Sequence, residues 1–166
     1  MADYKERFLQ PPEESYFLLG PRGTGKSTWL KAHYPKATRI DLLLGEEERY
    51  FSSFPERIRD VAHELKPGST LILDEIQRVP NLLPEIHALI EEKRGIQFIM
   101  TGSSARKLRR SVSDLLGGRA LLRQMPPFFA AELQKVQGHS IVGIRLAQSA
   151  ILPVLYLAVC LLFALA

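Results

Sequence analysis

The chain has 166 residues, of which 46% are hydrophobic and 24% charged, and it carries a formal net charge of +4. This length suits one domain with an appendage, and the composition excludes a chain that is disordered throughout. Cys160 is the single cysteine, which excludes an internal disulfide and a cysteine zinc cluster.

Apolar runs and amphipathic segments alternate along the chain. The apolar runs predict five strands, at 16–19, 38–43, 70–73, 96–100 and 119–124. The segments between them predict helices, the second of which is interrupted by a proline, at 26–33, 46–65, 81–94 and 103–110. Strands that alternate with helices need crossover connections, so we expect an α/β fold whose parallel sheet is covered by helices on both faces.

A glycine-rich segment joins the first expected strand to the first expected helix. It reads GPRGTGKST and consists of Gly20, Pro21, Arg22, Gly23, Thr24, Gly25, Lys26, Ser27 and Thr28. It matches GxxxxGK[ST], in which backbone N–H groups surround phosphate oxygens at the N-terminus of a helix. We expect Lys26 to reach the β- and γ-phosphates of a nucleotide and the Ser27 hydroxyl to coordinate Mg²⁺. The alternative is a glycine turn that matches the motif by chance.

The third expected strand ends in two carboxylates. Asp74 and Glu75 follow its apolar run directly, and Asp74 lies 48 residues after Lys26. In a chain that also has a phosphate-binding loop, an apolar strand that ends in two carboxylates is typical of a Walker B segment. We expect Asp74 to hold Mg²⁺ through water and Glu75 to polarise the attacking water. The alternative is an ordinary strand that ends in a solvent-exposed acidic turn. The pair also favours an ATPase with an extra strand between the two motif strands, either 96–100 or 38–43. The sequence contains no NKxD-type guanine-reading motif, which favours ATP over GTP.

The fourth expected strand runs into the polar segment Thr101-Gly102-Ser103-Ser104. A polar side chain at this strand end would lie beside the phosphate-binding loop, so Thr101 and Ser103 are candidate sensors of the γ-phosphate or of the attacking water. The alternative is a cap, with Ser103 or Ser104 at the N-terminus of the next helix.

Taken together, the motifs resemble those of prokaryotic AAA+ P-loop ATPases in which an uncharacterised C-terminal domain follows the ATPase domain. The matching segments are GPRGTGKST (20–28), RIDLL (39–43), LILDEIQRVPNLLPEIHALIE (71–91), FIMTGSSARKL (98–108), LLGGRA (115–120) and MPPFFAAEL (125–133). The resemblance implies an AAA+-type sheet with the strand order 5-1-4-3-2. It also implies that the family's usual C-terminal domain and a helical lid are absent here.

The resemblance draws attention to Arg119, which lies at the start of the fifth expected strand. An arginine at this place is expected to act as a finger across a subunit interface of a homo-oligomer, where it stabilises charge on the transferring phosphoryl group. The alternative is a surface arginine or a salt bridge at the sheet edge.

The basic excess of the chain is concentrated in residues 101–140, which contain seven Lys and Arg against two Asp and Glu. A surface for nucleic acid or an acidic partner is one interpretation. No aromatic residue between 104 and 124 could stack on a base, so we favour a solvated helix face, and nucleic acid stays the less favoured partner.

Composition divides the chain into an expected ATPase core at 1–138 and an apolar tail at 139–166. Residues 146–166 carry no charge and are just long enough to cross a hydrocarbon core. Three interpretations stay open: a membrane anchor, a non-native extension after a frameshift or truncation, and a helix that packs on the ATPase domain or a partner. Residues 1–10 lack the apolar region of a signal peptide, so we expect a cytoplasmic ATPase domain, membrane-associated if the tail is an anchor.

These features predict an ATP-binding protein that hydrolyses MgATP and couples hydrolysis to a conformational change in an assembly. The candidate catalytic residues are Lys26, Glu75, Thr101, Ser103 and Arg119, and the candidate Mg²⁺ ligands are Ser27 and Asp74. The alternative is a truncated nucleotide-binding module with little or no turnover, tethered to a membrane by its tail.

Overall fold

The computed structural model describes residues 6–103, 120–129 and 132. The chain divides into two compact units, 1–132 and 133–166, and all described residues belong to the first. Arg119, the expected helix after Ser103 and the apolar tail lie outside the described residues. The expected domain boundary at residue 138 stays a prediction.

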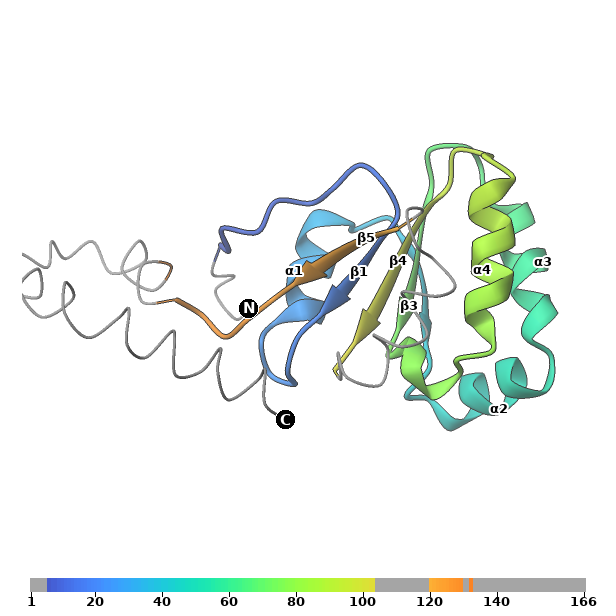
Figure 1. Ribbon diagram of the computed structural model, residues 1–166, viewed down its shortest axis with the longest axis horizontal. Coiled ribbons are helices and arrows are strands. Elements are labelled where there is room, and N and C mark those ends of the chain that lie inside the picture. The colour runs from blue at the N-terminus through green and yellow to red at the C-terminus, as the bar shows by residue number, and fades with distance from the viewer. Residues whose placement is uncertain (1–5, 104–119, 130–131, 133–166) are drawn as a thin grey trace, which may run out of the picture. The chain divides into compact units, whose positions relative to one another are not determined.

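The described elements show the expected alternation of strands and helices (Figure 1). The strands are β1 (Tyr16–Leu19), β2 (Thr38–Asp41), β3 (Thr70–Asp74), β4 (Gln97–Gly102) and β5 (Leu121–Gln124). The α-helices are α1 (Lys26–His33), α2 (Gly45–Ser53), α3 (Ile58–Glu64) and α4 (Leu82–Glu91), and 3-10 helices span Pro55–Arg57 and Ile76–Arg78. No helix in this described part of the chain combines the length and apolar character needed to cross a membrane.

All five strands are parallel and form one sheet in the order β2-β3-β4-β1-β5. The expected order 5-1-4-3-2 is this same order counted from the opposite edge, so the prediction is confirmed. The strand between β1 and β3 is β4, which decides between the two strands that the sequence left open.

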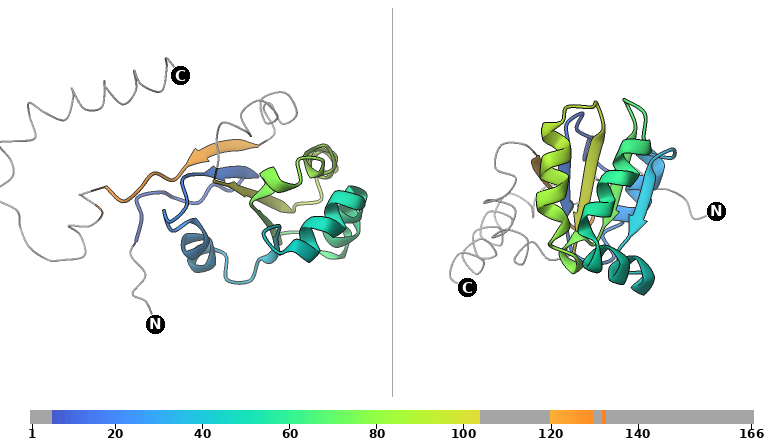
Figure 2. Two further views of the ribbon diagram at one scale, coloured as in Figure 1. Left: turned by 90° about the horizontal axis from the view of Figure 1, so that it is seen from below. Right: turned by 90° about the vertical axis from the view of Figure 1, so that its right-hand side faces the viewer.

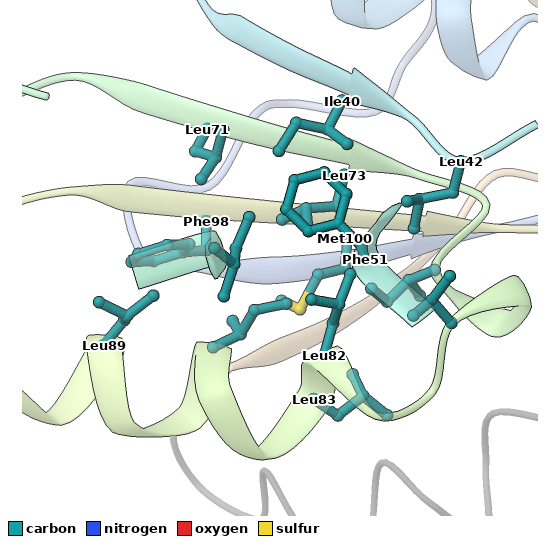
Figure 3. Close-up of a cluster of buried hydrophobic side chains, with 14 of the residues drawn as sticks. Ile40, Leu42, Phe51, Leu71, Leu73, Leu82, Leu83, Leu89, Phe98 and Met100 are labelled. Carbon is teal, nitrogen blue, oxygen red and sulfur yellow. The ribbon is translucent and has the colours of Figure 1, made fainter. Parts of the chain in front are cut away.

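Side chains of β1 alternate between two hydrophobic cores, one on each face of the sheet. Phe17 and Leu19 belong to the larger core, which includes side chains of β3, β4, α2, α3 and α4. Tyr16 and Leu18 pack with Trp29 of α1 in the smaller core. Figure 3 shows leucines of α4 that reach toward β3 and β4 across the larger core, and Figure 2 shows α3 and α4 side by side. Helices therefore cover both faces, as expected.

Several observed elements differ in their bounds from the expected ones. The helix expected at 81–94, for example, is observed as α4 at Leu82–Glu91. The expected interruption of the helix at 46–65 is confirmed: the segment forms α2, a 3-10 helix and α3, because Pro55 disfavours the helical conformation at Phe54, which has φ −136° and ψ 65°. β2 ends at Asp41 rather than at Leu43. There the Asp41 carboxylate accepts a hydrogen bond from the Leu43 N–H at 3.0 Å and stabilises a turn.

The carboxyl ends of the central strands meet at one edge of the sheet. Leu19 of β1 is in register with Gly102 of β4 and with Gln124 of β5, and Leu73 of β3 is in register with Met100 of β4. The segments that follow these strands therefore lie next to one another. In open parallel sheets this is the edge at which ligands bind.

Candidate functional site

The segment after β1 is a tight loop that leads directly into α1, and we call residues 20–27 the glycine-rich loop. Gly25 has a φ of 85°, and its carbonyl oxygen accepts a hydrogen bond from the Trp29 N–H at 2.8 Å at the start of α1. Only glycine adopts this left-handed conformation without a steric cost. The first N–H groups of a helix lack partners within the helix, and together with its dipole they favour an anion at this end.

The glycine-rich loop is fixed between the ends of two strands. The Gly20 N–H donates a hydrogen bond to the Gly102 carbonyl oxygen at 3.2 Å, and the Met125 N–H donates one to the Leu19 carbonyl oxygen at 2.7 Å. A Cβ atom on Gly20 would lie 2.2 Å from the Met125 carbonyl oxygen. The loop can therefore approach the end of β5 this closely only because position 20 has no side chain.

The Lys26 side chain folds back over the glycine-rich loop. Its Nζ donates hydrogen bonds to the carbonyl oxygens of Gly20 at 2.5 Å and of Pro21 at 3.0 Å, and Lys26 is only 6% exposed. Burial lowers the pKa of the Lys26 ammonium, and the carboxylates of Glu75 and Asp74 oppose this shift only in part. A positive charge is thus held beside a helix end that also favours an anion.

Asp74, at the end of β3, connects the glycine-rich loop to β4. Its Oδ2 accepts a hydrogen bond from the Ser27 hydroxyl at 3.4 Å, and its Oδ1 accepts one from the Thr101 hydroxyl. Thr101 is fully buried, and its Oγ1 also accepts a hydrogen bond from the Glu75 backbone N–H at 3.1 Å. One threonine therefore positions both residues of the acidic pair.

Glu75 adopts a left-handed backbone conformation, with φ 58° and ψ 47°, and is 6% exposed. Few residues other than glycine adopt this conformation, and such strain is often found at functional sites. The Glu75 Oε2 accepts hydrogen bonds from the Ser103 hydroxyl at 2.9 Å and from the Gln77 side-chain amide. Two donors from different strand ends therefore orient this carboxylate.

Sequence reasoning missed Gln77. Its Nε2 donates to the Ser103 Oγ at 3.2 Å as well as to Glu75, and its Oε1 is buried without a hydrogen-bond partner among the described residues. Its position two residues after Glu75 carries no recognisable signal, because the contact depends on the left-handed turn at Glu75 itself.

Sequence reasoning also missed a buried ion pair that contacts the glycine-rich loop. The Arg7 Nε lies 3.1 Å from the Glu132 Oε1, and an Arg7 terminal nitrogen donates to the Thr24 carbonyl oxygen at 2.8 Å. The partners are separated by 125 positions, so no local spacing could have predicted the pair.

The structure brings together the predicted site residues that lie within its described part. Direct or shared hydrogen bonds connect Ser27, Asp74, Glu75, Thr101 and Ser103, and the Lys26 ammonium interacts electrostatically with the two carboxylates. Five residues of the expected phosphate-binding segment are exposed at the surface: Pro21, Arg22, Gly23, Ser27 and Thr28. Within the described residues, no group of three or more His, Cys, Asp and Glu side chains could hold a metal ion.

Comparison with known proteins supports this fold. A family model described as an AAA domain matches residues 12–134. The Walker-type ATPase PABY2304 of Pyrococcus abyssi is similar in structure, with a TM-score of 0.52, 20% identity, and coverage of 70% of this chain and 50% of that chain. The Aeropyrum pernix ORC1 protein in complex with DNA gives a TM-score of 0.48 and 19% identity, with coverage of 76% of this chain and 43% of that chain. No curated protein matches the chain.

The chain spans half or less of the length of these two solved structures. At 20% identity, the likeness to the Pyrococcus abyssi ATPase concerns the fold alone. The family match includes the whole described sheet, the glycine-rich loop and the acidic pair. The chain therefore belongs to the AAA domain family, and this membership supports nucleotide binding in general.

Proposed function

We propose that this protein binds ATP with Mg²⁺ at the glycine-rich loop and hydrolyses it. The observation that carries the proposal is the chain of hydrogen bonds from Ser27 through Asp74 and Thr101 to Glu75. It joins a phosphate-binding loop, a pair of oxygen ligands and a carboxylate base at one edge of the sheet. These are the groups that positioning and charge stabilisation in phosphoryl transfer require.

Lys26 is the proposed ligand of the β- and γ-phosphates. Its Nζ donates to the carbonyl oxygens of Gly20 and Pro21, and phosphate oxygens would replace these acceptors. An anionic acceptor gives a stronger hydrogen bond than a neutral carbonyl. Backbone N–H groups of the glycine-rich loop and of the start of α1 would hold the remaining phosphate oxygens.

Ser27 and Asp74 fit Mg²⁺ by their chemistry. Their oxygens lie 3.4 Å apart, and Mg²⁺ typically takes one or two protein oxygen ligands and fills its other positions with phosphate oxygens and water. When bound, the ion neutralises charge on the β- and γ-phosphates. The Thr101 hydroxyl holds the Asp74 Oδ1 and so keeps Oδ2 toward Ser27, with Asp74 acting through water.

Glu75 is the proposed general base. The attacking water gives a proton to the Glu75 carboxylate while the water oxygen bonds to the γ-phosphorus. The bond between that phosphorus and the bridging oxygen breaks, which releases ADP. Ser103 and Gln77 orient the carboxylate, and Ser103 is the better candidate for the γ-phosphate sensor because it is partly exposed. Thr101 is fully buried, which supports a positioning role.

Lys26→Ala tests nucleotide binding. In the full chain we expect its dissociation constant for MgATP, measured by calorimetry, to rise about 10- to 100-fold, because a charge-assisted hydrogen bond to phosphate is lost. Lys31→Ala is the matched control, since Lys31 is an exposed lysine further along α1, and it should bind as wild type does. Equal affinity of the two variants would contradict the proposed site.

We propose that turnover requires assembly through Arg119, a residue outside the described part of the chain. If Arg119 acts across a subunit interface, the ATPase activity per chain should rise with protein concentration. Arg119→Lys should lower the maximal activity per chain, because lysine lacks the planar set of N–H donors of the guanidinium group. Arg123→Lys, on exposed β5, is the control and should leave the concentration dependence unchanged. Activity independent of concentration and of Arg119 would contradict assembly.

One observation favours a second function, a nucleotide-binding module with little or no turnover. The Glu75 Oε2 accepts hydrogen bonds from both Ser103 and Gln77, and these donors compete with an attacking water for that oxygen. Tight MgATP binding with no hydrolysis at any protein concentration would identify this module.

Membrane attachment through residues 146–166 rests on the sequence alone. If these residues form an anchor, the full chain should float with lipid vesicles in a flotation assay. The Leu157→Asp variant should not float, because the substitution places a charge in the apolar segment. A chain that stays unbound would contradict the anchor.

A further inference from the structure

Arg7 is a buried cation that the proposed chemistry does not use. It is 5% exposed, and each of its three guanidinium nitrogens has one acceptor: Nε donates to Glu132 at 3.1 Å, and the terminal nitrogens donate to the carbonyl oxygens of Thr24 at 2.8 Å and Pro126 at 2.6 Å. The guanidinium also lies over the Phe128 ring, 4.1 Å from its centroid. Only the planar fork of arginine can reach three acceptors in this way.

Glu132 holds Arg7 and is itself 2% exposed. Its Oε1 accepts a hydrogen bond from the Phe8 N–H at 2.9 Å, and its Oε2 accepts one from the Phe129 N–H at 2.9 Å. The carboxylate therefore fastens the segment before β1 to the segment after β5. Burial of both charges is costly, and such a pair adds little net stability compared with apolar side chains. A role in fixing one conformation accounts for the pair better than stability does.

The contact between Arg7 and Thr24 acts on the glycine-rich loop. Thr24 immediately precedes Gly25, whose left-handed conformation begins α1. The peptide between them is planar and trans, so its carbonyl and its N–H point in opposite directions. Because Arg7 holds the Thr24 carbonyl, the Gly25 N–H is fixed on the side away from Arg7. The loop is thus given one peptide orientation before any phosphate arrives.

We propose that Arg7, oriented by Glu132, is a positioning residue of the glycine-rich loop and sets its affinity for the phosphate chain of the nucleotide. This inference rests on the proposed binding of MgATP at the loop. In a pre-organised loop, binding is not weakened by the free-energy cost of ordering the loop, so loss of the Arg7 contact lowers the affinity. The effect falls on the phosphates, whichever base the nucleotide carries.

Two variants of the full chain separate this role from a merely structural one. Arg7→Lys keeps the charge and loses the fork. In Arg7→Met combined with Glu132→Gln, both charges leave together, while the new side-chain amide oxygen still offers an acceptor to one of the two N–H groups, that of Phe8 or that of Phe129. No buried charge is then left unpaired, so this double variant is expected to fold. The matched control is Arg59→Met with Glu85→Gln, which removes an ion pair of 2.5 Å between α3 and α4.

The readout is the dissociation constant of the folded protein for MgATP and, separately, for inorganic tripolyphosphate, which has phosphates but no base. We expect both Arg7 variants to weaken both ligands by the same factor of about 10, and the control to bind within about two-fold of wild type. Provided that the wild-type protein binds both ligands, two results would overturn the inference. One is a folded double variant whose affinity for both ligands is unchanged, and the other is a variant that loses affinity for MgATP but not for tripolyphosphate. A wild-type protein that binds neither ligand would instead overturn the proposed function, and the inference with it.

Discussion

The Ser27 hydroxyl lies 3.4 Å from the Asp74 carboxylate, although the two residues are 47 positions apart in the chain. Ser27 is in the first turn of α1 and Asp74 ends β3, and β4 separates β3 from β1 in the sheet. The contact exists because the carboxyl ends of parallel strands share one edge. It unites the two predicted Mg²⁺ ligands at a single place.

The Ser27–Asp74 contact predicts that nucleotide binding depends on Mg²⁺ through Asp74. Asp74→Asn removes the negative charge and keeps the shape, so the Mg²⁺ concentration that half-saturates ATP binding should rise about 10-fold or more. Titration of Mg²⁺ into the protein with a fixed ATP concentration measures this. Asp60→Asn on α3 removes an exposed carboxylate as control and should leave the titration unchanged. Overlapping titrations for Asp74→Asn and wild type would rule out Asp74 as a ligand.

The close approach of Gly20 to β5 predicts that this glycine cannot be replaced. In Gly20→Ala the new Cβ would meet the Met125 carbonyl oxygen at 2.2 Å, so backbone must move, at a cost of about 1–3 kcal/mol of the free energy of unfolding. Urea unfolding measures the loss. Gly45→Ala is the control, because its Cβ meets only the flexible Arg49 side chain and alanine favours the helix. Equal stability of the two variants would contradict the described packing.

The hydrogen bonds at Glu75 predict a selective effect of Gln77. Gln77→Ala removes a donor that orients the proposed base. Gln77 also contacts Ser103, the candidate sensor, but its hydrogen bonds to described residues reach neither Lys26 nor the proposed Mg²⁺ ligands, so kcat should fall about 10-fold while the dissociation constant for MgATP stays close to wild type. Steady-state kinetics combined with calorimetry separates the two quantities. Gln97→Ala, whose amide holds the segment before β1, is the control, and its kcat should stay near that of wild type. A fall in affinity with unchanged kcat would contradict the positioning role of Gln77.

The fold could be predicted from sequence because its determinants are local. Strands such as 16–19 are short, wholly apolar runs that end at glycine, and α1 was predicted with its observed bounds at 26–33. The strand order came from the family resemblance rather than from periodicity. The interruption at Pro55 was also predicted and is observed. Prediction was poorest at the ends of elements, as at β2, which ends at Asp41 where the Asp41 carboxylate stabilises a turn.

The site was predictable only in part. Lys26, Ser27, Asp74 and Glu75 belong to contiguous motifs, so their spacing indicates them. The dual role of Thr101 depends on the register of β3 against β4, and the Arg7–Glu132 pair depends on segments 125 positions apart. Such contacts arise from tertiary packing, and one sequence carries no local pattern for them.

The Arg7–Glu132 pair also predicts a pH dependence of stability. Burial alone would raise the pKa of Glu132, but the N–H groups of Phe8 and Phe129 and the Arg7 guanidinium outweigh it and hold the pKa below its ordinary value of 4.5. A lowered folded-state pKa contributes stability that is present above the unfolded-state pKa and lost as the pH falls through the folded-state pKa. Between neutral pH and the ordinary pKa the contribution is therefore constant.

Urea unfolding at a series of pH values tests this dependence. Below about pH 4.5 the wild-type free energy of unfolding should fall more steeply than that of the Arg7→Met, Glu132→Gln variant, which has no carboxylate at position 132. Parallel curves for the two proteins throughout the acid range would show that Glu132 does not titrate as the geometry implies.

The central claim is that Glu75 activates water for hydrolysis of ATP bound at the glycine-rich loop. The most direct measurement is phosphate release from MgATP by the full chain, together with the MgATP dissociation constant, for wild type, Glu75→Gln and the exposed control Glu64→Gln. The account predicts turnover in wild type and Glu64→Gln, and a loss of about 100-fold or more in Glu75→Gln with nucleotide still bound. Equal turnover in Glu75→Gln and wild type, or binding without turnover in all three proteins, would contradict it.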